Sequence, residues 1–590
     1  MTYRAPVADI AFTLNHIAGF SQLIERGLFE DLDMDTAAAI LEEAGRFAEE
    51  ELAPTNRASD VQGARLVGGE VVMPDGFAEA YRKWVAGGWG SVASPREFGG
   101  QGLPFALSMA LTEMWNSANM AFGLNPLLTQ AGVHALIAHG SKELQRKYLP
   151  KLVTGEWTGS MQLTEPQAGS DLRFMKTRAV YAGDGSYKIS GTKIFITYGE
   201  HSLTDNIIHI VLARLPDAPH GTKGLSLFLI PKFLVNDDGS LGSRNDVTCA
   251  KLEEKLGIHG SPTAVLNYGD KGGAIAWLIG APNGGLKAML TMMIEARIGV
   301  GVQGVGIAER AFQQALAYAR ERKQGALEGG GVDSSVAIIE HPDVKRTLLT
   351  MKAKTSAARA ICYATSVAMD IAHHSPDASE RRRAHAEAAL LTPVAKAYST
   401  DIGVEVASEG IQVHGGMGYI EETGAAQHYR DARIAPIYEG TNGIQAIDLV
   451  TRKLPSESGE TIYGFIAALK ETAHRVKAAN ETALGSMGER LEASIADLEE
   501  ASGWLLGKLQ YDRAEALAGA TPFLRLFGIA SGGAYLAKGA LAAAREGADA
   551  RVIEARHFAE SLMGETSGLK HAVAHAYETV NDAKAVLGEH

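Results

Sequence analysis

Apolar residues follow helical spacing over the first part of the chain. The segment LEEAGRFAEEELAP (41–54) places apolar side chains among acids at that spacing, and Pro54 is expected to end the helix. A second run over 110–140 is rich in helix formers and ends in glycine. Ser141 then matches a helix N-cap, and Pro150 is expected to end the helix that follows. The pattern predicts helices up to about residue 160.

The pattern changes near residue 160, where apolar and polar residues begin to alternate. Residues 177–199 alternate on both sides of Asp184-Gly185, which is a strong signal for a β-hairpin. The runs 206–215 and 224–232 are typical of buried strands, and 263–270 is a further candidate. A compact β-domain is therefore expected in the middle of the chain.

Helical spacing returns near residue 281 and continues almost to the end of the chain. Residues 286–323 form a long apolar-faced pattern, and Pro342 suits the first turn of the next helix. The polar stretch KLPSESGET (453–461) indicates a linker. The expected domains are an N-terminal extension over 1–35, an N-terminal helical domain over 36–158, a β-domain over 159–280, a helical domain over 281–452 and a C-terminal helical domain over 460–590.

Composition narrows the class of protein without identifying it. The chain has 590 residues, enough for several domains, and a formal net charge of −13. An acidic surface argues against nucleic acid or an anionic membrane as the main partner, but it leaves room for a local basic pocket for a phosphorylated ligand. Two distant cysteines give neither a disulfide framework nor a metal site. No signal peptide and no uncharged membrane-spanning stretch is recognised, so a cytoplasmic location is expected.

The segment MQLTEPQAGSDL (161–172) lies between the first helices and the β-domain. Thr164, Ser170 and the backbone amides around Gly169 could bind a polar ring edge or a phosphate. An ordinary turn-rich connection explains the same residues. The segment alone therefore leaves both interpretations open.

The segment GTKIFITYG (191–199) combines an aromatic ring with a hydroxyl group. In a regular strand Phe195 and Thr197 share one face, because side chains alternate. That pair suits a planar heterocycle such as an isoalloxazine, although a plain core strand would also contain such residues.

The third segment contains a glutamate in an apolar context. Glu439 follows the residues IAPIY (434–438), and Thr441 or Asn442 can cap the helix behind it. Apolar surroundings raise the pKa of a carboxyl, which favours a general base near neutral pH. The helix N-terminus would lower that pKa, and Glu439 could also be only a first-turn acid favoured by the helix dipole.

Other segments allow a functional and an ordinary interpretation. The glycine turn HGGMG (414–418) permits close approach of a ligand, or it ends a helix. The motif G-x-G-x-x-G at 299–304 lacks a preceding strand, so tight helix packing is favoured over dinucleotide binding. Arg322 is either a solvated helix-end cation or a phosphate ligand. The run Arg381-Arg382-Arg383 is interpreted as a solvated helix start.

Together these segments resemble the acyl-CoA dehydrogenase family. The sequences KYLPKL, LTEPQAGSDL, GTKIFIT, ARERKQG, QVHGGMGY and RDARIAPIYEGTNGIQ occur in the family's order, within a core over about 80–450. The N-terminal YRAPVADIAF and the extra C-terminal segment are most similar to the long subfamily that includes 3-methylmercaptopropionyl-CoA dehydrogenase.

The resemblance implies an α+β multidomain fold in which a helical domain, a β-barrel-like domain and a helical bundle domain enclose FAD, with a C-terminal helical extension. It implies Glu439 as the catalytic base and no metal. The other implied positions are Leu163, Thr164, Phe195, Ile196 and Thr197 at the flavin; Thr441 at FAD; Arg322, Gln412, Gly415 and Gly416 at the pyrophosphate and adenosine end of FAD, in a partner subunit; and Ser170, Arg297 and Gly440 near the CoA substrate.

The sequence departs from the family pattern at several of these positions. Phe195 replaces the usual tryptophan, ERKQG lacks the common Thr-Phe-Gly after Arg-Lys, and Asn442-Gly443 replaces Ser-Gln. Some relatives carry the base at the position of Ala296, where alanine cannot serve. The adjacent Glu295 is expected on another helix face.

The activity that the resemblance implies is α,β-dehydrogenation of an acyl-CoA thioester to a trans-2-enoyl-CoA. The substrate would be 3-methylmercaptopropionyl-CoA or a short- or medium-chain acyl-CoA, with electrons passed to electron-transfer flavoprotein by a homodimer or homotetramer. The alternatives are an acyl-CoA oxidase that uses O₂, a DNA-associated flavoprotein of the same fold and a helical scaffold without cofactor. The many acids of the C-terminal segment argue against the DNA-associated protein.

Overall fold

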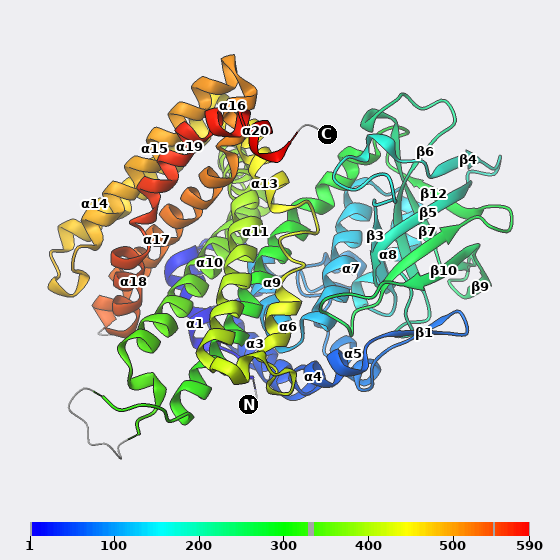
Figure 1. Ribbon diagram of the computed structural model, residues 1–590. Coiled ribbons are helices and arrows are strands. Elements are labelled where there is room, and N and C mark those ends of the chain that lie inside the picture. The colour runs from blue at the N-terminus through cyan, green and yellow to red at the C-terminus, as the bar shows by residue number, and fades with distance from the viewer. Residues whose placement is uncertain (1–2, 328–334, 547–548, 589–590) are drawn as a thin grey trace.

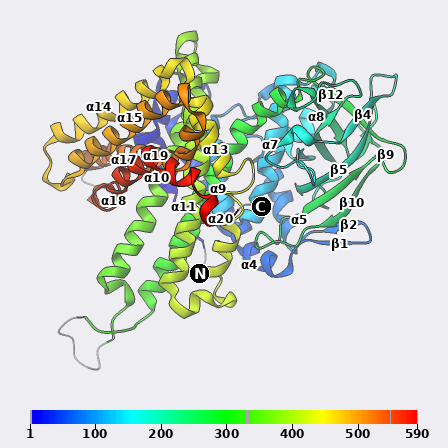
Figure 2. The ribbon, with the colours of Figure 1, turned by 45° about the horizontal axis from the view of Figure 1, so that its top comes forward.

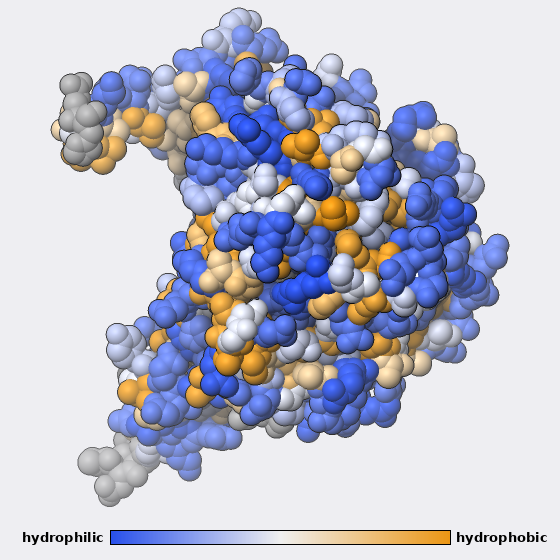
Figure 3. Space-filling view, turned by 90° about the vertical axis from the view of Figure 1, so that its right-hand side faces the viewer, coloured by the Kyte–Doolittle hydropathy of each residue, from blue (hydrophilic) through white to orange (hydrophobic). Residues whose placement is uncertain are grey.

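The computed structural model describes residues 3–327, 335–546 and 549–588. Helices form the centre and one side of the molecule, and the β-domain lies on the other side (Figure 1). The last helices of the chain form a bundle against the central helices, on the side away from the β-domain, and a second view shows the same arrangement (Figure 2). The surface of the β-domain side is mostly hydrophilic, with smaller apolar areas between (Figure 3). The fold is therefore the α+β multidomain class expected from the sequence.

The first part of the chain is helical, as its pattern predicts, with one small hairpin. Its elements are α1 Val7–Phe12, η1 Thr13–Ala18, α2 Phe20–Glu25, α3 Met34–Phe47, η2 Ala48–Leu52, α4 Ala53–Gln62, β1 Arg65–Val67, β2 Glu70–Val72, α5 Phe77–Ala86, α6 Phe105–Ala118, α7 Met120–His139 and α8 Lys142–Thr154.

Two prolines do not end helices where the sequence pattern predicts. Pro54 lies in the first turn of α4, directly after the π-helical turn η2, where its missing N–H costs no helical hydrogen bond. Pro150 lies inside α8, because burial of the following Leu152 and Val153 stabilises one more turn. Gly155, with φ of 83°, then ends that helix. The predicted N-cap is confirmed, since Ser141 Oγ accepts the Leu144 N–H at 3.2 Å.

The β-domain contains a ring of five strands. Strand β5 pairs with β12, β12 with β7, β7 with β6, and β4 joins β6 back to β5. The predicted hairpin at Asp184-Gly185 is the antiparallel pair β4–β5, and β3 pairs in parallel with β6. The strands are β3 Thr158–Gln162, β4 Arg178–Tyr181, β5 Tyr187–Thr197, β6 Ile207–Arg214, β7 Leu225–Pro231, β8 Phe233–Val235, β9 Leu241–Arg244, β10 Val247–Leu252, β11 Thr263–Tyr268 and β12 Ala274–Ile279.

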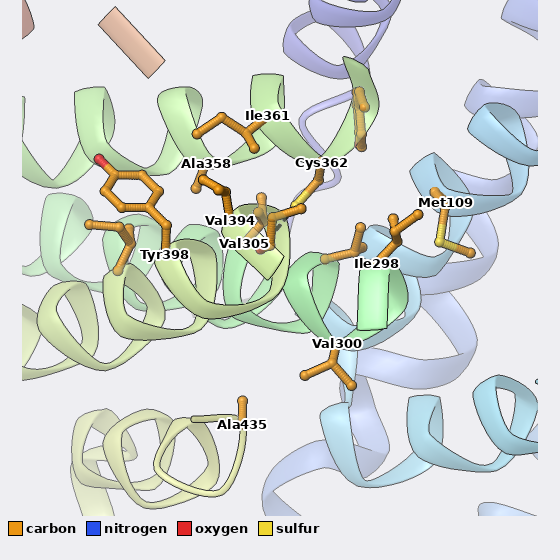
Figure 4. Close-up of a cluster of buried hydrophobic side chains, with 14 of the residues drawn as sticks. Met109, Ile298, Val300, Val305, Ala358, Ile361, Cys362, Val394, Tyr398 and Ala435 are labelled. Carbon is orange, nitrogen blue, oxygen red and sulfur yellow. Dashed lines mark hydrogen bonds between the residues drawn. The ribbon is translucent and has the colours of Figure 1, made fainter. Parts of the chain in front are cut away.

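Three long helices form the centre of the molecule, and side chains such as Ile298, Ile361 and Val394 fill the space between them (Figure 4). The G-x-G-x-x-G motif lies inside α9 and packs against α11. A Cβ atom on Gly301 would lie 2.4 Å from the Ala395 carbonyl oxygen, and one on Gly304 would lie 2.3 Å from that of Ser399. The predicted helix packing is thus confirmed. These helices are α9 Gly285–Glu321, α10 Pro342–His374 and α11 Ala378–His414, followed by α12 Ala425–Ala432, α13 Asn442–Asp448 and η9 Leu449–Lys453.

The C-terminal bundle is connected to the start of the chain. Asp9 forms ion pairs with Lys352 at 2.5 Å and with Arg551 at 3.0 Å, and Lys538 Nζ donates to the Ile17 carbonyl at 2.6 Å. The first helices therefore join the central helices to the bundle. The bundle consists of α14 Glu460–Ala479, α15 Met487–Tyr511, α16 Arg513–Ala518, α17 Ala520–Glu546, α18 Asp549–Ser561, α19 Glu565–Asn581 and α20 Lys584–Leu587.

Helix α17 is long and apolar enough to meet a length-and-hydropathy test for a membrane span. Its most apolar window is 78% buried inside the protein, which is typical of a core helix in a bundle. Arg525 and Lys538 interrupt the apolar run, consistent with the absence of an uncharged spanning stretch in the sequence.

Candidate active site

The candidate base lies on a tight turn immediately before α13. Glu439 has φ of 57° and Gly440 has φ of 84°, and Thr441 then caps α13 by accepting the Ile444 N–H at 3.2 Å. A residue with a side chain adopts this left-handed conformation at a cost of about 1–2 kcal/mol. Such a turn persists only where neighbouring groups hold it in place.

Three buried side chains hold the carbonyl oxygens of this turn. The Glu439 carbonyl accepts Arg297 Nε at 3.4 Å and Gln445 Nε2 at 3.3 Å. The Gly440 carbonyl accepts Lys396 Nζ at 3.0 Å and Gln445 Nε2 at 3.1 Å. The backbone N–H groups of both residues have no hydrogen-bond partner in the described part of the chain. The turn therefore offers unpaired amides next to a carboxyl.

Lys396 is a component of the site that the sequence analysis missed. It lies in α11, is fully buried, and donates to Asn442 Oδ1 at 2.8 Å as well as to the Gly440 carbonyl. Asn442 Nδ2 in turn donates to Asp401 Oδ1 at 2.7 Å. Its position within the apolar run LLTPVAKAY could have identified this lysine from the sequence, because a buried lysine normally has a specific partner.

The electrostatics of the turn suit a proton acceptor. Burial raises the pKa of Glu439 above its ordinary value, although the cations of Arg297 and Lys396 oppose that shift. Burial also lowers the pKa of Lys396 to about 7. Arg297 is further paired with Asp448 at 3.8 Å. Because its pKa lies above the ordinary range, this carboxylate can take a proton more readily than an exposed one.

The candidate flavin contacts in β5, which are Phe195, Ile196 and Thr197, lie where the pairing of this strand is irregular. The pairing with β11 shifts between Ala264 and Leu266, and Phe195 has φ of 60°. Simple alternation therefore does not hold through this segment, contrary to the argument made from the sequence. Phe195 is nevertheless 60% exposed while Ile196 is 2% exposed, so the ring does face outward from the core.

The turn over 161–172 is held by a buried ion pair. Glu165 accepts Lys193 Nζ at 2.9 Å and the Thr177 hydroxyl at 2.6 Å, and Lys193 also donates to the Leu163 carbonyl. The hydroxyls of Thr164 and Thr197 have no hydrogen-bond partner in the described residues, and Ser170 is exposed. The turn is thus rigid in its backbone while its candidate hydroxyls stay available.

The remaining candidates form a second, separate group. Arg322, Gln412, Gly415 and Gly416 are all exposed, and a Cβ atom on either glycine would meet no atom within 4 Å. Gln412 lies sixteen residues beyond Lys396 on α11, which corresponds to about 24 Å. The structure therefore brings Arg297, Gly440 and Thr441 together with Glu439, but it does not bring this second group to the same place within one chain.

Comparisons with known proteins identify the family of this chain. Family models match residues 34–156, 160–270 and 283–454 as the N-terminal, middle and C-terminal domains of acyl-CoA dehydrogenase, and 465–584 as an "acetyl-CoA dehydrogenase C-terminal like" domain. The chain is 48% identical to 3-methylmercaptopropionyl-CoA dehydrogenase of Ruegeria pomeroyi, over 94% of each chain.

Solved structures share the whole fold at lower sequence identity. Caenorhabditis elegans ACDH-11 in complex with C11-CoA aligns with a TM-score of 0.78 at 20% identity, over 100% of this chain and 96% of that one. An acyl-CoA dehydrogenase from Bacillus anthracis complexed with FAD aligns with a TM-score of 0.73 at 22% identity, over 95% and 92%. This chain belongs to the acyl-CoA dehydrogenase family of FAD-dependent oxidoreductases.

Proposed function

We propose that Glu439 is the catalytic base of an α,β-dehydrogenation that converts an acyl-CoA to its trans-2-enoyl-CoA. The observation that carries this proposal is the strained turn at residues 439–440, which buried Arg297, Lys396 and Gln445 hold by its carbonyl oxygens. Backbone strain of this kind is found mainly at functional sites. It persists only where the surrounding structure stabilises it, as these three side chains do here.

Each group of the turn has a defined task in this reaction. The α-proton of a thioester is weakly acidic, so its removal needs both a base and stabilisation of the developing enolate oxygen. Glu439, with its raised pKa, supplies the base. Its unpaired backbone N–H can donate to the thioester carbonyl oxygen, and the anchored carbonyl groups prevent the turn from rotating away.

The residues present fit FAD. Phe195 exposes an apolar ring at the end of β5, and the hydroxyls of Thr164 and Thr197 are free to bind a polar ring edge. These residues, with Leu163, Ile196 and Thr441, would hold the flavin, which when bound accepts the hydride equivalent from the β-carbon. The protein itself supplies orientation and the exclusion of water.

The active assembly is proposed to be a homodimer or homotetramer. Arg322, Gln412, Gly415 and Gly416 are exposed, and Gln412 lies about 24 Å along α11 from Lys396, which contacts the turn of the base. We therefore infer that these residues would hold the pyrophosphate and adenosine end of the FAD of a partner subunit. Light scattering of the purified flavoprotein gives the assembly size. Loss of FAD from an Arg322→Gln variant, with Arg320→Gln as control, would support the cross-subunit contact, whereas equal FAD content would contradict it.

The proposed substrate is 3-methylmercaptopropionyl-CoA or another short- or medium-chain acyl-CoA, with electron-transfer flavoprotein as the acceptor. The support is the 48% identity over 94% of the chain with the Ruegeria pomeroyi enzyme that carries this name. Steady-state assays with thioether, linear and branched acyl-CoAs would rank the substrates. Stoichiometric peroxide release would instead indicate an oxidase.

The role of the base is tested by Glu439→Gln. This variant is expected to retain bound FAD and to lose bleaching of the flavin by acyl-CoA under anaerobic conditions. Glu295→Gln is the matched control, because Glu295 pairs with His134 and contacts neither residue 439 nor 440 through a hydrogen bond. Normal bleaching by the Glu439 variant would remove this carboxylate from the mechanism.

A further inference from the structure

The G-x-G-x-x-G motif in α9 contains one polar side chain that tight helix packing does not explain. Gln303 is fully buried within this otherwise apolar stretch. Its Oε1 accepts a hydrogen bond from the hydroxyl of Tyr438, the residue immediately before the proposed base Glu439. Its Nε2 donates to Asn116 Oδ1 in α6 at 3.2 Å. Buried amides are normally paired at both ends, and one end of this amide is paired next to the base.

The hydrogen-bond chain through Gln303 runs in a single direction. Asn116 Nδ2 donates to the Thr112 carbonyl at 2.8 Å. Because a carbonyl can only accept, Asn116 must present its Oδ1 to Gln303, and Gln303 must present its Oε1 to Tyr438. Burial and the neighbouring carboxylate of Glu439 raise the pKa of the Tyr438 phenol, so its hydroxyl stays protonated near neutral pH. The chain therefore fixes the phenolic hydrogen toward Gln303.

The far end of this chain lies on α6, which is itself fixed at two places. Asp370 of α10 accepts the first two N–H groups of α6 at 2.7 and 2.9 Å. Glu113, one turn before Asn116, is paired with the buried Arg359 at 2.7 Å. Close packing also confines the amide, since a Cβ atom on Gly123 of α7 would lie 2.6 Å from Asn116 Oδ1. The chain therefore connects the catalytic turn to a rigid part of the core.

Gln303 holds the turn at a point that its other anchors do not reach. The three buried side chains described above contact the carbonyl oxygens of residues 439 and 440. The hydrogen bond of Gln303 instead fixes the side chain of Tyr438, ahead of the base. The chain is thus held both before and after the residue with the positive φ, which limits the directions in which its carboxylate can point.

We infer, on the basis of the function proposed above, that Gln303 is a positioning residue that acts on Glu439 through Tyr438. Its task is to hold the carboxylate at the α-carbon of the thioester, where a displacement of about 1 Å can cost about 100-fold in rate. Loss of this contact slows removal of the α-proton. It leaves the binding of acyl-CoA nearly unchanged, because the contact is made between two protein side chains behind the base.

The test is a double-mutant cycle of Gln303→Met and Tyr438→Phe on the FAD-loaded enzyme. Each single variant is expected to lower the anaerobic rate of flavin bleaching at saturating acyl-CoA about tenfold, while the half-saturating concentration changes less than about twofold. The double variant should be no slower than the slower single variant, because both changes remove the same contact. Gln145→Met is the matched control and should keep the wild-type rate, since this buried glutamine donates to two carbonyls in the N-terminal domain.

A wild-type bleaching rate in either single variant, or losses that multiply in the double variant, would overturn the inference. A lower FAD content or thermal midpoint with a normal rate per bound flavin would overturn it as well, because that result indicates a purely structural role. If Gln303→Met yields no folded flavoprotein, the rate of Tyr438→Phe decides, since this change removes a single hydroxyl group. Failure of the proposed function is distinguishable, because Glu439→Gln would then bleach normally, whereas failure of this inference alone leaves Glu439→Gln inactive.

Discussion

Replacement of Lys396 by methionine separates the role of the anchoring cation from that of the base. Methionine fills a similar volume but cannot donate to the Gly440 carbonyl or to Asn442 Oδ1, which Lys396 contacts at 3.0 and 2.8 Å. The carbonyl keeps Gln445 Nε2 at 3.1 Å, whereas Asn442 Oδ1 keeps only the Thr400 hydroxyl at 3.4 Å. One buried acceptor is thus left poorly satisfied, at a cost of about 1–3 kcal/mol.

We expect this cost to appear mainly as a distorted turn at residues 439–440. If about 2 kcal/mol of it appears in the transition state, kcat/KM falls about 30-fold. The pKa of Glu439 should also rise, because Lys396 is one of the cations that oppose its upward shift. Since the pKa of Lys396 itself is about 7, this second effect should be largest below pH 7, where the lysine is charged.

The assay is the rate of anaerobic flavin bleaching by acyl-CoA as a function of pH. Lys354→Met is the control, since Lys354 pairs with Glu405 at 2.7 Å and Glu405 retains Arg525. A Lys396→Met variant with wild-type rates and an unshifted acid limb would refute the reasoning. A uniform loss of FAD and folded protein in the variant would show that the lysine acts on the fold and not on the turn.

Three further outcomes are expected. Gly440→Ala should lower the bleaching rate about tenfold with FAD retained, because the φ of 84° is strained for alanine and its Cβ would lie 2.7 Å from Gln445 Nε2; an unchanged rate would contradict this. Arg359→Met should destabilise the protein by about 3–5 kcal/mol, since it leaves Glu113 buried without its cation, and a thermal midpoint equal to the wild type would refute it. The wild-type bleaching rate should fall as the pH falls through a pKa above the ordinary 4.5 of a glutamate, because protonation of Glu439 removes the base; an acid limb at or below 4.5 would contradict the raised pKa.

Local chemistry made much of the architecture predictable from the sequence. The hairpin at Asp184-Gly185 and the caps at Ser141 and Thr441 depend on neighbouring residues, so a pattern over a few positions identifies them. The G-x-G-x-x-G motif was interpreted correctly for a similar reason, because the helical composition before Gly299 excluded a strand. The order and type of the elements could be predicted wherever the contacts that determine them join residues close in sequence.

Long-range contacts account for what the sequence did not show. Lys396 meets the Gly440 carbonyl across 44 positions, and Arg359 meets Glu113 across 246, and neither pairing leaves a periodic signal. The positive φ of Glu439 is likewise imposed by its surroundings and not by its own preference. The prediction that Pro150 ends its helix was wrong, because burial of the residues after it outweighs the local penalty of proline in a helix.

The contacts of Asp9 and Ile17 with Arg551 and Lys538 also have a consequence for biosynthesis. The partners in these contacts are separated by 542 and 521 positions. The first helices therefore cannot make these contacts until the last part of the chain has left the ribosome. At 5–20 residues per second that delay is roughly 30 to 110 s. During this time the apolar side chain of Ile17, which is buried in the finished protein and lies against Gly539 of α17, lacks the bundle that completes its cover. Nascent chains should therefore be most prone to aggregate, and most dependent on chaperones, just before the bundle is complete.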